Sequence, residues 1–344
     1  MIKTVRKSNI ELLRIVAMLL VLTVHAGFYS LGVPTPTEAA TMPLNVITRL
    51  FFQSFSVIAV LVFVLISGWF GIRTKVKSLV NFLFQCIFYS LIIFGVMLCL
   101  GRAHLDWKSI QNVLLFVNSF WFIKAYLCLM IFAPVLNAFV ETASEKQLRT
   151  VLVAFFAFQA IYGWLTTGAA WFERGYSVIS FFGLYLLARY VRLYPCRPFI
   201  LPRKYDMLIY WAIVIATTLV AYVMLRLGCS ESTVDVVYRL TSPIIIAEAL
   251  YLLLYFSKLD FQNRFVNWMA GSCFAVFLIQ QNPYFGRPVY AHTIKHIYST
   301  FNGPAVVLLT AAFILLIFVM AILVDQVRKQ IWKWVGERDR KSLQ

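Results

Sequence analysis

Ten apolar stretches, each about as long as a membrane-crossing helix, constrain this chain more than any other feature. A helix needs roughly 20 mostly apolar residues to cross about 30 Å of hydrocarbon. With 61% hydrophobic and 13% charged residues, the chain has too little polar surface for a water-soluble domain and too many apolar groups for disorder. We therefore predict an all-α polytopic membrane protein with about ten transmembrane helices. They lie near residues 10–29, 46–70, 79–100, 120–140, 148–167, 176–194, 207–227, 236–256, 265–285 and 304–325.

The formal net charge of +17 is best explained by topology. With the N-terminus inside, most Lys and Arg residues fall on the cytoplasmic side, as the positive-inside rule requires, and both termini are then cytoplasmic. The basic tail, about residues 326–344, contains Trp332 and Trp334, which is typical of an interfacial anchor on anionic lipid. No separate basic module points to nucleic acid. Residues 1–344 are therefore predicted to form a single membrane domain.

The first stretch carries three polar residues on one helical face. Arg14 and His25 are eleven residues apart, about three turns and 16 Å along a helix, and Glu11 lies three residues before Arg14. Taken singly, Arg14 could snorkel to the cytoplasmic interface and His25 could lie among the outer headgroups. Because charges at membrane depth usually face a protein interior or an aqueous cavity, the pair together favours a functional cavity.

A small-residue pair, Ser67-Gly68, ends the second stretch and is followed by three cations, Arg73, Lys75 and Lys77. Ser-Gly permits close helix packing, and basic residues mark the inner side of a membrane protein. The same pattern would also suit a phosphorylated cofactor that arrives from the cytoplasm. Composition favours the packing interpretation.

Two further groups allow more than one interpretation. Trp121 and Tyr126, with Lys124 between them, could form an aromatic belt with a snorkelling lysine or could bind substrate. Glu248 lies two turns into an apolar stretch, where a carboxyl group is expected to be protonated or paired. A proton relay, an acid that binds a hydroxyl group and an inert paired residue all remain open for it.

Amides and a cation gather at the outer end of the ninth stretch: Gln280, Gln281, Asn282 and Arg287. These groups commonly recognise carbohydrate hydroxyls, and they also cap helices.

No metal site is predicted. The six cysteines show no CxxC spacing or Cys/His cluster, and no disulfide is expected. His292 and His296 are four residues apart but have no acidic or Cys partner, so we expect them to be exposed histidines of an external loop. The longest loops are predicted at about 30–45 and 287–303.

Four segments together resemble the acyltransferase-3 family of membrane acyltransferases. The first is Glu11-x-x-Arg14 followed by ten residues and His25, which is similar to the family's opening Arg-x10-His motif. The second is VFVLISGW with its basic loop, and the third is SFWFIKAYLCLMIFAPVLN. The fourth comprises TSPIIIAEAL and GSCFAVFLIQQNPYFGRP. The resemblance spans nearly the whole chain.

The resemblance implies an enzyme that moves an acyl group, usually acetyl, from cytoplasmic acyl-CoA to a hydroxyl of a surface carbohydrate. It implies that His25 is catalytic and that Arg14 lies along the acyl-CoA path; Ser67, Arg73, Lys75 and Lys77 could then contact the donor, and Glu11 could orient Arg14. Trp121, Tyr126, Glu248, Gln280, Asn282 and Arg287 are candidate acceptor contacts. Gln280-Gln281 departs from the family's His-Asp, and a glutamine cannot shuttle a proton.

His25 could act as general base or as a transient acyl carrier. The expected partners are acyl-CoA, a carbohydrate acceptor and membrane lipids in a bacterial inner membrane, and a homo-oligomer is possible. A transporter or flippase for a lipid-linked sugar or small solute would use the same buried charges, but no duplicated halves or matching broken helices are visible. A non-catalytic partner in polysaccharide assembly is a third alternative.

Overall fold

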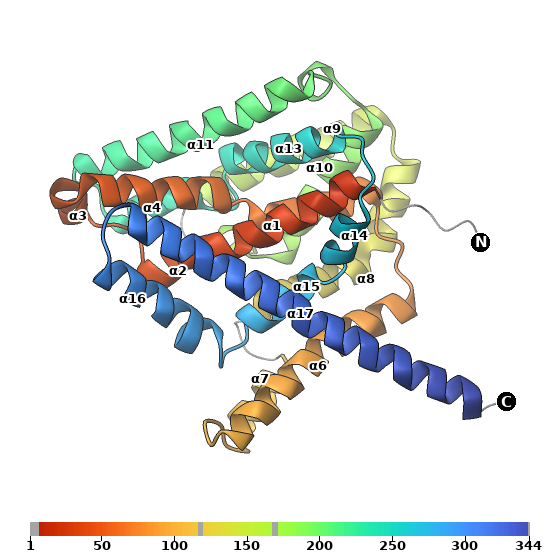
Figure 1. Ribbon diagram of the computed structural model, residues 1–344. Coiled ribbons are helices and arrows are strands. Elements are labelled where there is room, and N and C mark those ends of the chain that lie inside the picture. Colours follow the sequence, from red (N-terminus) through yellow and green to blue (C-terminus); the bar gives the residue numbers. More distant parts are fainter. Residues whose placement is uncertain (1–6, 116–119, 167–170, 343–344) are drawn as a thin grey trace.

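The computed structural model describes residues 7–115, 120–166 and 171–342, which form helices and, within these ranges, no β-strand (Figure 1). The first ten helices are α1 (Ser8–Ala26), α2 (Phe28–Leu31), α3 (Pro36–Thr41), α4 (Pro43–Ser56), α5 (Ala59–Phe70), α6 (Val76–Cys99), α7 (Trp107–Val113), α8 (Trp121–Thr142), α9 (Glu145–Phe158) and α10 (Val178–Leu193). The others are α11 (Arg203–Arg226), α12 (Glu231–Asp235), α13 (Pro243–Ser257), α14 (Arg264–Ala270), α15 (Cys273–Gln280), α16 (His292–Thr300) and α17 (Pro304–Ser342).

The prediction of an all-helical polytopic membrane protein is confirmed. Eight helical segments in the described ranges are long and apolar enough to cross a membrane. The predicted sixth and ninth spans are shorter than expected: α10 has 16 residues, and the ninth is divided into α14 and α15. The exact number of crossings and the side on which the termini lie therefore remain predictions.

Two predicted loops contain helices. Within 30–45, α3 begins with Pro36 after Thr35, whose side chain accepts from the backbone N–H of Glu38 while Glu38 bonds back to Thr35. Within 287–303, α16 carries His292 and His296 on its exposed side, so the prediction of loop histidines was wrong about the backbone. A buried stripe with helical spacing, Ile294 and Ile297, holds α16 to the bundle and was overlooked in the sequence.

A glycine lets α5 and α10 approach each other closely. A Cβ atom on Gly68 would lie 2.9 Å from the Cα of Tyr185 and 3.0 Å from the Cβ of Ala188. The packing interpretation is therefore confirmed for Gly68, because only glycine fits there without a shift of α10.

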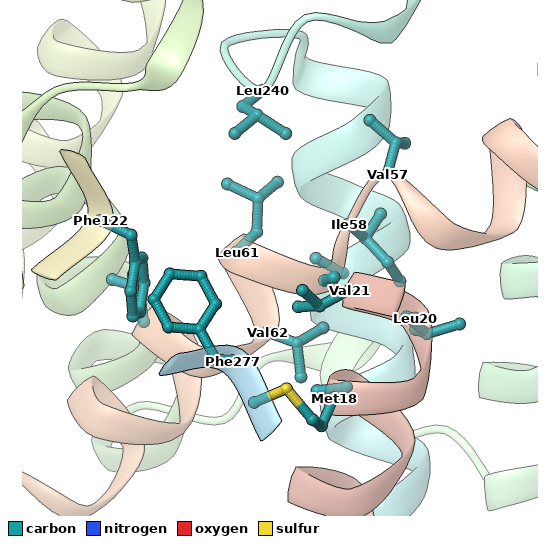
Figure 2. Close-up of a cluster of buried hydrophobic side chains, with 14 of the residues drawn as sticks. Met18, Leu20, Val21, Val57, Ile58, Leu61, Val62, Phe122, Leu240 and Phe277 are labelled. Carbon is teal, nitrogen blue, oxygen red and sulfur yellow. The ribbon is translucent and has the colours of Figure 1, made fainter. Parts of the chain in front are cut away.

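The hydrophobic core lies where α1 and α5 meet the helices on either side of them. Figure 2 shows Met18 and Val21 of α1 beside Leu61 and Val62 of α5, with Phe122 and Phe277 facing each other from α8 and α15. The rings of Phe122 and Phe277 pack edge to face, with centroids 5.3 Å apart. This core fixes α1, α5, α8 and α15 around a shared space.

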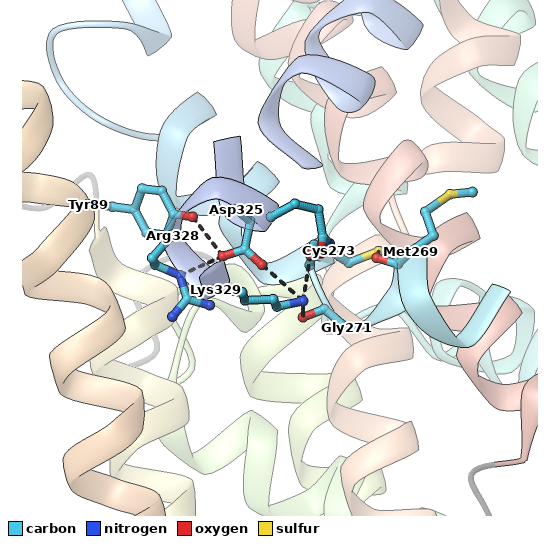
Figure 3. Close-up of polar contacts among 9 residues, drawn as sticks. Tyr89, Met269, Gly271, Cys273, Asp325, Arg328 and Lys329 are labelled. Carbon is cyan, nitrogen blue, oxygen red and sulfur yellow. Dashed lines mark hydrogen bonds and ion pairs between the residues drawn. The ribbon is translucent and has the colours of Figure 1, made fainter. Parts of the chain in front are cut away.

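The turn between α14 and α15 is held by a charged cluster on α17 (Figure 3). Lys329 Nζ donates to the Gly271 carbonyl at 3.0 Å and to Ser272 Oγ at 2.7 Å, and it pairs with the buried Asp325. Asp325 also accepts from the hydroxyl of Tyr89 on α6 and from Arg328, each at 2.7 Å. Three helices are thus joined at the start of α15.

The first turn of α1 and the last part of α17 lie on the same side of the bundle (Figure 1). The backbone of the basic tail continues α17 to Ser342, whereas the side chains beyond Gln330, including the Trp332 and Trp334 of the predicted anchor, lie outside the described residues.

Candidate active site

A cavity of about 280 Å³ lies between α1, α5, α8 and α15. Its walls are largely apolar and aromatic, with a few polar groups, which is the usual character of a ligand site. They comprise Arg14, Met18, Val21, Val60, Phe63, Ile66, Ser67, Phe82, Phe122, Tyr126, Ala270, Cys273, Phe274 and Phe277. The cavity therefore brings together three of the four segments that carried the family resemblance, together with part of the fourth.

Arg14 lines one end of this cavity and is paired with Glu11. The Arg14 Nη1 atom lies 2.6 Å from the Glu11 Oε1 atom, and the exposed fractions of the two side chains are 38% and 7%. The prediction that the two residues share one face is confirmed. Because Glu11 engages Nη1, the guanidinium is held in position and its other N–H groups remain available to a ligand.

His25 lies one turn beyond Val21, the last residue that α1 contributes to the cavity wall. Gln280 is placed in the same way on α15, one turn beyond Phe277. The His25 Nδ1 and Gln280 Oε1 atoms are 2.7 Å apart, although the residues are separated by 255 positions in the chain. α1 and α15 thus bring a histidine and an amide together just beyond the cavity.

The contact with Gln280 determines which ring nitrogen of neutral His25 carries the proton. An amide oxygen only accepts hydrogen bonds, so with Gln280 placed in this way the proton of neutral His25 is on Nδ1. Nε2 then carries the lone pair that a general base needs. Gln280 is fully buried, and its own Nε2 has no hydrogen-bond partner in the structure, which leaves a donor beside the imidazole.

Tyr29 and Arg287 extend this group toward the surface. The Tyr29 ring centroid is 5.0 Å from that of His25, and the Arg287 guanidinium lies 5.6 Å from the centre of the Tyr29 ring. Arg287 is exposed. Tyr29 was not predicted; it lies in α2, after the break at Gly27 that ends α1.

Ser67 and Tyr126 meet on the opposite cavity wall. Ser67 Oγ donates to the Phe63 carbonyl at 2.9 Å, so the Tyr126 hydroxyl, also at 2.9 Å, donates to Ser67 Oγ. Ser67 was predicted to contact the acyl-CoA donor and Tyr126 to contact the carbohydrate acceptor, and both residues line this one cavity.

Other predicted residues lie away from the cavity. Arg73, Lys75 and Lys77 are exposed between Ser67 and the body of α6. Trp121 packs edge to face on Tyr176, at 4.7 Å between ring centroids. Their roles in binding remain predictions.

Two further polar residues of the predicted site, Asn282 and Glu248, are buried outside the cavity wall. Asn282 is buried, and its Oδ1 accepts from the Tyr284 backbone N–H at 3.0 Å in the turn that follows α15. Glu248 is fully buried in α13, away from the cavity wall, and neither carboxyl oxygen has a hydrogen-bond partner in the structure. A paired, inert role is therefore not supported for Glu248.

Several wall residues were not predicted. Phe122, Phe274, Phe277 and Cys273 looked like ordinary core residues in the sequence, since an aromatic stripe on a membrane helix is most often packing. Only the meeting of α8 and α15 turns them toward a shared space.

Comparison with known proteins agrees with this arrangement. The model of the acyltransferase-3 family, described as an acyltransferase domain, matches residues 7–324. Neither the curated proteins nor the solved structures gave a match to this chain. The family match spans every residue of the cavity wall, along with His25 and Gln280. The chain therefore belongs to the acyltransferase-3 family of membrane acyltransferases.

Proposed function

We propose that this enzyme transfers an acyl group, most simply acetyl, from cytoplasmic acyl-CoA to a hydroxyl of a cell-surface polysaccharide or glycolipid in a bacterial inner membrane. The observation that carries the proposal is the His25–Gln280 contact at 2.7 Å, one turn beyond a cavity whose other end holds Arg14. A cation at one end of the cavity and a neutral base one turn beyond its other end suit a long donor with an anionic head and a reactive thioester.

His25 Nε2 acts as the general base in this proposal. It takes the proton of the acceptor hydroxyl as the oxygen attacks the thioester carbonyl. The tetrahedral intermediate then collapses, the C–S bond breaks, and the departing sulfur recovers the proton from His25, which gives an ester and free CoA. The unpartnered Gln280 amide N–H, beside the imidazole, is proposed to donate to the developing oxyanion.

Arg14 is proposed to bind the anionic part of acyl-CoA at the cavity mouth. Its guanidinium is fixed by Glu11 and is the only cation that lines this cavity in the part of the chain that the structure describes. Arg73, Lys75 and Lys77 do not line the cavity but follow α5 in the chain as exposed cations, and they are proposed to attract the anionic donor by charge. Arg287, stacked over Tyr29 at the other end, is proposed to meet the carbohydrate.

Purified protein in liposomes with ¹⁴C-acetyl-CoA tests this function. The proposal predicts acceptor-dependent appearance of label in an ester, with equimolar free CoA, and loss of both in His25→Ala. Transfer of label by His25→Ala at the wild-type rate would overturn the role of His25. Movement of a labelled glycan across the bilayer without CoA release would favour a transporter instead.

The same preparation separates a general base from an acyl carrier. A carrier would release one equivalent of CoA per enzyme before any acceptor is added, whereas a general base releases CoA only with the acceptor.

A further inference from the structure

A second cavity, of about 240 Å³, lies on the other side of α1 from the candidate active site. The first cavity contacts α1 at Arg14, Met18 and Val21, whereas the second contacts it at Leu19 and Thr23. α4 and α17 both pack against α1 (Figure 1), and residues of all three helices line the cavity. Its walls comprise Leu19, Thr23, Ala26, Gly27, Arg49, Phe52, Tyr298, Val307, Thr310, Ala311, Ile314 and Leu315.

The second cavity continues into a groove that opens at the start of α4 and α17. The groove has a volume of about 630 Å³ and shares Tyr298 and Val307 with the cavity. Leu44 and Met42 on its rim are 72% and 50% exposed. Apolar walls thus run from the end of the bundle into the space between two candidate membrane spans.

Two buried polar atoms of this second cavity have no hydrogen-bond partner in the structure: Arg49 Nε and Thr310 Oγ1. Arg49 is 6% exposed, and its other nitrogens are engaged: Nη1 with Glu38 Oε1 at 2.8 Å and Nη2 with the Gly32 carbonyl at 3.0 Å. A buried donor without a partner costs about 1–3 kcal/mol, so a ligand that accepts from Arg49 gains from the contact.

The charge of Arg49 is already compensated. Burial alone would raise the pKa of the Glu38 carboxyl, but the Thr35 backbone N–H and the Arg49 guanidinium outweigh it and hold that pKa below its ordinary value. Glu38 therefore stays ionised, and the site presents an N–H and a hydroxyl without net charge. Such a site selects a neutral oxygen acceptor over an anion.

We propose that this groove and cavity bind an acyl chain of a membrane glycerolipid, with the ester carbonyl accepting from Arg49 Nε and Thr310 Oγ1. The apolar walls of the second cavity and its groove match the lipid acyl chain in polarity. The ester carbonyl is the neutral acceptor at the point where that acyl chain joins the glycerol headgroup. A carbohydrate would leave most of its hydroxyls unpaired against these apolar walls. The proposal does not depend on the acyl transfer reaction, because this site lies across α1 from His25.

Photolabelling of the full-length protein in nanodiscs tests the proposal. The probe is phosphatidylethanolamine with a diazirine in its acyl chain, compared with an analogue in which ether links replace both esters and remove the carbonyls. The expected result is labelling of α4 and α17 peptides, about five-fold stronger with the ester probe, as one net hydrogen bond implies. Equal labelling by the two probes would overturn the proposal and indicate that water satisfies the polar atoms.

Two variants locate the label. Ala311→Phe fills the cavity and should abolish labelling of α17, whereas the same substitution at Ala312, the adjacent residue outside the cavity lining, should leave it unchanged. Thr310→Val keeps the side-chain shape and should reduce the preference for the ester probe two-fold or more. Unchanged labelling in a folded Ala311→Phe protein would place the lipid elsewhere and overturn the proposal.

Discussion

Gln280 provides the sharpest structural test of the proposed chemistry, because among the described residues its side chain hydrogen-bonds only to His25, the proposed general base. Its Oε1 lies 2.7 Å from His25 Nδ1, within a fully buried side chain. Gln280→Leu replaces the amide with an apolar side chain of similar size and removes the acceptor. The Nδ1–H then loses its partner. The other tautomer, in which Nε2 carries the proton and so cannot accept one, is no longer disfavoured.

The expected size of the effect follows from that hydrogen bond. An unsatisfied buried N–H costs about 1–3 kcal/mol. If the transition state is destabilised by that amount relative to the bound substrate, kcat falls about 5- to 150-fold. Gln280→Glu restores an acceptor for the Nδ1 proton, so it should recover more activity than Gln280→Leu. Both rates are measured as acceptor-dependent CoA release in liposomes.

Tyr290→Phe is the matched control for a lost buried hydrogen bond. The Tyr290 hydroxyl donates to the Leu22 carbonyl of α1 at 2.7 Å, again joining α1 to the C-terminal part of the chain. This variant should lower thermal stability and leave kcat close to wild type. A kcat of Gln280→Leu equal to wild type, in folded protein, would refute the positioning role of Gln280.

Three further predictions concern the cavity and its supports. Arg14→Ala should raise the KM for acyl-CoA about ten-fold or more with a smaller change in kcat, whereas Lys124→Ala, which removes an exposed cation from α8, should change neither; equal effects would show that Arg14 acts only through net charge. Gly68→Ala should lower the free energy of unfolding in detergent by about 1–3 kcal/mol, because its Cβ would lie 2.9 Å from the Cα of Tyr185, whereas Gly95→Ala, with open space around it, should be neutral or stabilising. Asp325→Asn leaves the cations of Arg328 and Lys329 without their buried carboxylate and should cost about 3–5 kcal/mol of stability; an unchanged melting temperature would contradict the clamp on the α14–α15 turn.

Helical periodicity predicted well the part of the site that α1 contributes. Glu11 and Arg14 are three residues apart on one helix, so their pairing follows from helical geometry alone. The same geometry placed His25 on that face. These contacts need only α1, and nothing about its neighbours.

The part of the site that α15 contributes depends on contacts between segments that are distant in the sequence. Gln280 contacts His25 although 255 positions separate them in the chain. The family motifs indicated that both segments belong to the site, but they did not indicate a hydrogen bond between them. Glu248 looked similar to His25 in the sequence, as a polar residue in an apolar span, yet it lies away from the cavity. Periodicity shows which face of a helix is unusual and does not show which helices share a space.

The break in the ninth predicted span and the helix α16 were missed for a different reason. An apolar run of sufficient length predicts a span, but Gly271 and Ser272 interrupt it, and Lys329 of α17 holds the interruption in place. That contact cannot be inferred from composition. In α16, polar residues outnumbered the apolar stripe, and the segment resembled a loop.

The central claim, that His25 catalyses transfer of an acyl group from a donor on one side of the membrane to an acceptor on the other, is tested most directly in sided liposomes. ¹⁴C-acetyl-CoA is supplied only on the side of the Arg14 end of the cavity, and a glycan acceptor only on the opposite side, with inward- and outward-facing protein separated by an affinity tag. The account predicts ester-linked label on the acceptor for wild type and a loss of at least about 100-fold for His25→Ala. Label transfer by His25→Ala at the wild-type rate, or transfer that requires the donor and acceptor on the same side, would contradict it.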